Sequence, residues 1–92
     1  MLAAFRADLA QRLNAMEALA AGLQDGSLDF EDASAAVAAH LHDIKGTGRP
    51  FGVPQATDLA REFERIIKSG DWHRASATGL VRHWVARLKG LC

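Results

Sequence analysis

The sequence predicts an all-α protein, folded as an antiparallel up-down-up-down bundle of four helices. Apolar residues recur at steps of three and four over four stretches, and no run of β-branched residues alternates with polar ones as a strand would require. Short segments rich in glycine, proline or aspartate separate these stretches, and helices joined by short loops pack best as antiparallel neighbours. Hydrophobic residues make up 49% of the 92 residues. We expect a single domain over residues 1–92, with a small core.

Residues 2–24 are predicted to form the first helix, because their apolar positions fall on one face. Gly26 should end this helix, since glycine readily adopts the left-handed conformation that closes a helix. The apolar stripe comprises Leu2, Phe5, Leu9, Leu13, Met16, Ala20 and Leu23.

The second helix should begin after Asp29, whose side chain can cap free backbone N–H groups, and end near Arg49. Pro50 disfavours the helical conformation in the residue before it. His42 lies about 100° round the helix from Leu41, so its ring should sit at the edge of the core and partly in water. The apolar stripe comprises Phe30, Ala33, Val37, Leu41, Ile44 and Gly48.

Pro54 suits the first position of a third helix, and Asp71 is the expected N-cap of a fourth. In the loop before the third helix, Phe51 can close the end of the bundle and Gly52 can make the turn. The apolar residues of these two helices are Ala56, Leu59, Phe63, Ile66 and Ile67, then Trp72, Ala77, Val81, Trp84, Val85, Leu88 and Leu91.

The most informative stretch runs His42-Asp43-Ile44-Lys45-Gly46-Thr47-Gly48 and is followed by Phe51-Gly52. Lys45 and Gly46 lie one turn from His42 on the same side of the helix. Neutral imidazole is a nucleophile near pH 7, and a cation beside it favours an anion. Glycine is costly inside a helix, so Gly46 indicates clearance for a partner or close helix packing, whereas the inward Gly48 indicates packing. The arrangement suits a histidine that accepts and hands on a phosphoryl group.

His-x-x-Lys-Gly followed by Phe-Gly, inside an all-helical chain of this size, resembles the signature of the histidine-containing phosphotransfer (HPt) domain family. The resemblance implies a four-helix bundle that relays phosphoryl groups between aspartates of response-regulator receiver domains. His42 would be the phosphoryl acceptor, and Lys45 would pair with the phosphoryl oxygens. By the same resemblance, Glu64 would accept a hydrogen bond from Nδ1–H of His42 and leave Nε2 as the nucleophile. The alternative for Glu64 is a surface ion pair with Lys68.

Receiver domains are the expected partners, with a hybrid sensor histidine kinase as a further candidate. The expected docking surface comprises Ala38, Leu41, Lys45, Gly46 and Arg49. Magnesium would belong to the receiver, so no cofactor or metal is expected on this chain.

Two other functions stay open. The phosphotransfer domain of a chemotaxis-type histidine kinase would receive phosphoryl from a separate ATP-binding domain, and Glu64 fits that alternative. A structural bundle would bind a partner and transfer nothing. Asp43 resembles the acid that follows the phosphorylated histidine in sensor kinases. The 92 residues hold no glycine-rich nucleotide boxes, however, so we expect no ATP-dependent kinase activity of the chain's own.

The net charge is zero but unevenly distributed. Residues 1–44 hold seven acidic and two basic side chains, a net charge of −5, and residues 45–92 hold nine basic and four acidic ones, a net charge of +5. The two halves can compensate each other in the bundle, or the second half can present a basic patch to an acidic partner. No basic run is interleaved with aromatic residues, so nucleic acid is not an expected partner.

No apolar stretch is long enough to cross a membrane, and the start of the chain does not resemble a signal peptide, so we expect a cytoplasmic monomer. The only cysteine, Cys92, cannot form an internal disulfide. His40 and His42 point about 200° apart on a helix and should not chelate one metal ion.

Overall fold

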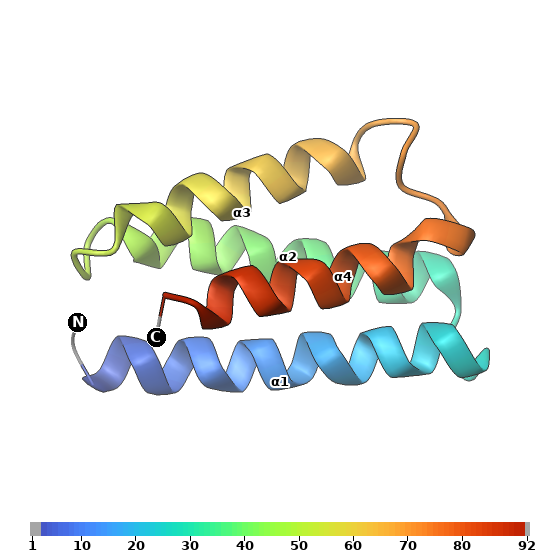
Figure 1. Ribbon diagram of the computed structural model, residues 1–92, viewed down its shortest axis with the longest axis horizontal. Coiled ribbons are helices and arrows are strands. Elements are labelled where there is room, and N and C mark those ends of the chain that lie inside the picture. Colours follow the sequence, from blue (N-terminus) through green and yellow to red (C-terminus); the bar gives the residue numbers. More distant parts are fainter. Residues whose placement is uncertain (1–2, 92) are drawn as a thin grey trace.

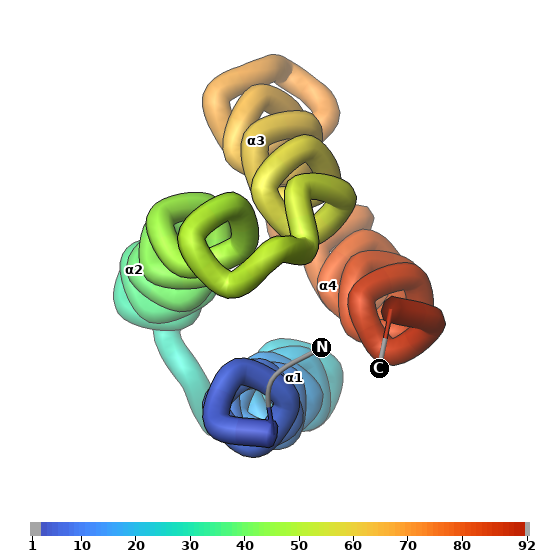
Figure 2. Tube along the Cα trace, turned by 90° about the vertical axis from the view of Figure 1, so that its left-hand side faces the viewer, coloured from blue at the N-terminus to red at the C-terminus, as the bar shows by residue number. Residues whose placement is uncertain are grey.

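The computed structural model describes residues 3–91, which form four α-helices and no strand (Figure 1). Successive helices run in opposite directions, and the view along the bundle places α1 beside α2 and α4, with α3 beside α2 (Figure 2). The predicted four-helix bundle is therefore confirmed. Leu2 and Cys92, on which two predictions rest, lie outside the described residues. The helices are α1 (Ala3–Asp25), α2 (Phe30–Gly48), α3 (Pro54–Ile67) and α4 (Arg74–Lys89).

The two ends of α2 follow the local rules. Asp29 is its N-cap. The carboxylate of Asp29 accepts hydrogen bonds from the backbone N–H groups of Glu31 and Asp32, at 3.1 and 3.2 Å. The helix ends at Gly48 with Arg49 as its C-cap, and Gly52 turns the chain with a φ of +79°. These boundaries confirm the predictions and fix the position of the turn that carries His42.

The predicted start of the fourth helix is wrong. The helix begins at Arg74 with His73 as its N-cap, not directly after Asp71. The hydroxyl of Ser76 accepts a hydrogen bond from the His73 N–H at 3.2 Å and donates one to the backbone carbonyl of Asp71 at 2.6 Å. A serine inside the first turn thus ties down the helix start. Trp72 consequently packs on the core from the loop rather than from the helix.

Aromatic stacking holds α3 to α4. Trp84 is 0% exposed, and its ring stacks on Phe63 of α3 with centroids 5.0 Å apart and on Trp72 at 5.5 Å. Elsewhere α3 and α4 meet very little, whereas α2 packs extensively on α3, and α1 on α4. At one end of the bundle, Phe51 lies 5.5 Å from Phe5 between ring centroids and closes the core as predicted. None of the helices within residues 3–91 is both long and apolar enough to span a bilayer.

Close backbone contact joins α2 to the start of α3. Thr57 is 2% exposed, and its hydroxyl donates a hydrogen bond to the backbone carbonyl of Lys45 at 2.9 Å. A Cβ atom on Gly48 would lie 2.5 Å from Thr57 Oγ1 and 2.9 Å from the backbone oxygen of Val53. The predicted packing role of Gly48 is confirmed. This contact between Thr57 and the end of α2 positions α3 against the helical turn that carries His42.

Changing Gly48→Ala should destabilise the fold. The added methyl group meets backbone atoms that cannot move aside, and overpacking of this kind costs about 1–3 kcal/mol. Urea denaturation followed by circular dichroism would measure the loss in the free energy of unfolding. Gly46→Ala, two residues earlier in the same helix, is the matched control, because a Cβ atom there meets nothing within 4 Å. Equal stability of Gly48→Ala and the wild type would contradict the packing role.

Candidate functional site

His42 lies on α2 with its side chain exposed to solvent. The neighbouring Leu41 and Ile44 are buried in the core and anchor the backbone beneath it. This is the position predicted from the angle between His42 and the apolar stripe. The imidazole is therefore held on a rigid support and is open to a second molecule.

Lys45 and Glu64 meet across α2 and α3. The Nζ atom of Lys45 lies 3.0 Å from Oε1 of Glu64, and the two side chains are 32% and 17% exposed. The contact is an ion pair without the geometry of a hydrogen bond. A half-buried carboxylate thus neutralises the cation nearest to His42 along its face of the helix.

This ion pair corrects the predicted partner of Glu64. Within residues 3–91, Glu64 forms neither the expected hydrogen bond with Nδ1 of His42 nor the alternative ion pair with Lys68. Lys45 shares the face of His42, and its ammonium group carries a full charge that attracts a carboxylate. Helical periodicity could not rank these three partners, because His42 and Lys45 lie on the neighbouring α2 and Lys68 lies one turn further along the chain from Glu64.

The residues expected on the docking surface divide into exposed and buried ones. Gly46 and Arg49 are exposed, and Ala38 is half-buried. Arg49 reaches over the loop to Asp58, with 3.4 Å between Nη2 and Oδ1. The prediction for Leu41 is wrong: it is 0% exposed, because it lies at the centre of the apolar stripe and fills the core.

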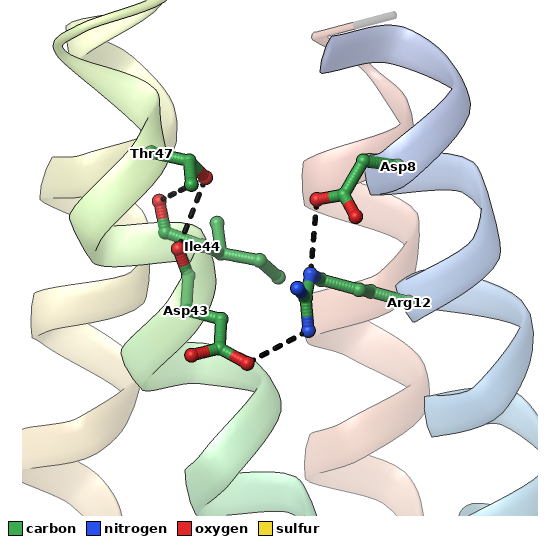
Figure 3. A network of polar contacts seen from close by, with 5 residues as sticks. All are labelled: Asp8, Arg12, Asp43, Ile44 and Thr47. Carbon is green, nitrogen blue, oxygen red and sulfur yellow. Dashed lines mark hydrogen bonds and ion pairs between the residues drawn. The ribbon is translucent and has the colours of Figure 1, made fainter. Parts of the chain in front are cut away.

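Asp43, directly after His42, points to the other neighbour of α2. Its carboxylate accepts a hydrogen bond from Nη1 of Arg12 on α1 at 2.9 Å, and Nε of the same arginine donates to Asp8 at 3.0 Å (Figure 3). The hydroxyl of Thr47 donates to the backbone carbonyl of Asp43 at 3.0 Å. The acid therefore bridges α1 and α2, and sequence patterns held no signal for this arginine partner.

His40 lies on the side of α2 that faces this bridge. It lines a shallow groove with Asp8, Gln11, Arg12 and Ala15, and its Nδ1 atom is buried without a hydrogen-bond partner. Burial lowers the pKa of His40 below the ordinary 6.5, and the nearby Arg12 lowers it further, against the opposing effect of Asp43 and Asp8. The ring is therefore neutral at pH 7.

His40 should make the fold sensitive to mild acid. The unfolded chain binds a proton at the ordinary pKa, whereas the folded chain binds it only at a lower pH. The free energy of unfolding should therefore fall as the pH drops from above 6.5 through the folded pKa. In His40→Gln this part of the pH dependence should vanish, which urea denaturation at pH 7.5 and pH 5 would show. An identical pH dependence in both proteins would contradict the pKa direction.

A metal centre has no support in the part of the chain that the structure describes. No group of three or more histidine, cysteine, aspartate or glutamate residues there is placed to hold an ion. The two remaining histidines, His73 and His83, are exposed at the start and on the surface of α4.

Comparison with known protein families gives one result. The sequence model of the Hpt domain matches residues 1–91. No curated protein and no solved structure gave a match.

Proposed function

The chain belongs to the Hpt domain family, and on that premise we propose that His42 is the residue that carries the phosphoryl group. Hpt domains perform phosphotransfer in two-component phosphorelays. The observation that carries the proposal is an exposed imidazole on a rigid helix, one turn from a lysine and from a glycine that leaves the approach clear. Each of the other three histidines lacks that combination.

The chemistry is an in-line transfer from an aspartyl phosphate of a receiver domain. Nε2 of His42 attacks phosphorus, an N–P bond forms, and the bond from phosphorus to the aspartate oxygen breaks. The reverse step returns the group to an aspartate. Magnesium, bound by the receiver, would neutralise most of the developing charge. Lys45 would leave Glu64 and pair with the phosphoryl oxygens, which carry more negative charge than the carboxylate.

The partners would dock over the turn that carries His42. The exposed or half-buried residues expected on this surface are Ala38, Lys45, Gly46 and Arg49. Receiver domains are the proposed partners, with a hybrid sensor histidine kinase as the source of phosphoryl. A cytoplasmic monomer completes the proposal, as expected from the sequence.

The decisive experiment is phosphoryl exchange with isolated receiver domains. Receivers from the same genome are phosphorylated with radioactive acetyl phosphate and magnesium, freed of reagent, and mixed with the chain. Label should move to the chain and should be lost in acid but kept in alkali, as a phosphohistidine requires. Absence of label with every receiver would overturn the exchange with receiver domains.

A second candidate is transfer from a separate ATP-binding kinase domain to His42. It is favoured by the half-buried Glu64 carboxylate in contact with Lys45, since a glutamate at this position fits chemotaxis-type kinases. The same labelling experiment distinguishes the two functions. This candidate requires that radioactive phosphoryl reach the chain from ATP through a kinase domain, and that none reach it from a phosphorylated receiver.

Lys45→Gln should slow the transfer to His42 without unfolding the bundle. Loss of one charge-assisted contact to the phosphoryl oxygens corresponds to about a tenfold lower rate or more. The glutamine amide can still donate to Glu64, so the carboxylate is not left alone. Rapid-quench kinetics would measure the rate, with Lys89→Gln, at the last residue of α4, as the charge-matched control. Equal rates for the two variants would remove Lys45 from the chemistry.

A further inference from the structure

An open groove that includes Lys45, one helical turn from His42, is lined mainly by basic side chains. Its lining residues are Lys45 from α2, Arg61, Glu64 and Arg65 from α3, and Lys68, the C-cap of α3. The three bases Arg61, Arg65 and Lys68 follow one another at steps of four and three, so they form one row along one face of the helix. We call these three residues the basic row.

The basic row is not neutralised within the bundle. Among the six ion pairs of residues 3–91, none involves Arg61, Arg65 or Lys68, whereas Lys45 is paired with Glu64. Four bases and one acid therefore leave the groove with an excess of three positive charges. Like charges at these spacings repel each other, so the row costs stability in the isolated fold.

Charge compensation between the two halves of the chain does not explain the row. Only one of those six ion pairs, Arg82 with Glu17, joins the acidic first half to the basic second half. The other acids of the first half face α1, cap α2 or lie in solvent, and none reaches α3. The positive charge of the second half is thus left available to an outside partner.

The row also lies close to the proposed site of chemistry. Lys45 belongs both to the groove and to the face of α2 that carries His42 one turn earlier. A molecule that brings an aspartyl phosphate to Nε2 of His42 therefore extends over this side of the bundle. Guanidinium groups bind carboxylates through two parallel hydrogen bonds, which gives orientation as well as attraction.

We infer that the basic row is a docking strip for an acidic segment of the receiver domain that exchanges phosphoryl with His42, an inference that rests on the proposed function. The strip selects receivers that present carboxylates beside their phosphorylated aspartate and accelerates their association. Nucleic acid fits the groove less well, because none of its lining residues offers an aromatic ring on which a base can stack.

The test reverses charge at two positions of the row, in Arg61→Glu/Arg65→Glu, and at two exposed positions outside it, in Arg6→Glu/Lys89→Glu. Both double variants change the net charge equally. Transfer from the receivers that label the wild type is measured at increasing receiver concentration and at two salt concentrations. The variant of the row should lose about tenfold or more in kcat/KM at low salt and show a weaker salt dependence, with kcat unchanged. The control should lose less than about twofold.

Each outcome separates this inference from the proposed function. Equal losses in both double variants, or no loss in either, overturn the docking strip while transfer to His42 stands. A wild type that no receiver labels overturns the proposed function, and the strip with it. Thermal melting shows that both variants are folded. A single-stranded oligonucleotide that binds the wild type but not the variant of the row, with receiver kinetics unchanged, would assign the groove to nucleic acid and overturn the strip.

Discussion

His42→Gln should abolish labelling of the chain by a phosphorylated receiver. Glutamine keeps a polar side chain at the surface but has no nucleophilic nitrogen, so no N–P bond can form. The side chain of His42 is exposed, and a surface substitution changes the free energy of unfolding by about 0.5 kcal/mol or less. Radioactive gels and thermal melts on the same preparation would therefore show complete loss of label in a fully folded protein.

His40→Gln is the matched control for this experiment. Both histidines lie on α2, but His40 faces α1 and has a buried Nδ1 atom beside Arg12. Labelling of His40→Gln should equal that of the wild type at pH 7.5. Residual label in His42→Gln that disappears in the double variant would instead assign the phosphoryl group to His40 and overturn the role of His42.

Local rules predicted most of the fold. The N-cap at Asp29, the helix start at Pro54 and the turn at Gly52 each depend on the conformational preference of one or two residues. The structure has all three where they were predicted. The start of α4 could not be found this way, because Asp71 has the side chain preferred at an N-cap, whereas the observed N-cap is His73.

The candidate site was predicted less completely than the fold. The angle of His42 to the apolar stripe predicted a ring at the edge of the core and partly in water, and the residue is exposed. The partner of Glu64 and the contact of Arg12 with Asp43 depend on how two helices are positioned against each other, which periodicity does not give. Leu41 was predicted both in the apolar stripe and on the docking surface, and its burial shows that only the first prediction is correct.

Gly46→Gln should separate function from stability. Gly46 is exposed, and a Cβ atom there meets no atom within 4 Å, so the longer side chain can extend into solvent beside His42. Replacing glycine inside a helix removes a cost of about 0.5–1 kcal/mol, so the variant should melt at or above the wild-type temperature. The same side chain would keep the receiver's aspartyl phosphate from bonding distance of Nε2, and misplacement by about 1 Å can lower a rate about a hundredfold.

Gly79→Gln on α4 is the matched control, because Gly79 is also an exposed glycine inside a helix with nothing within 4 Å of an added Cβ atom. It should melt like Gly46→Gln but transfer phosphoryl at the wild-type rate, since it lies on a different helix from His42. Gly46→Ala, with its smaller side chain, should fall between the wild type and Gly46→Gln in transfer. Unfolding of Gly46→Gln would mean that Gly46 is needed for packing, as Gly48 is. Wild-type transfer by a folded Gly46→Gln would mean that the receiver does not dock over this turn of α2.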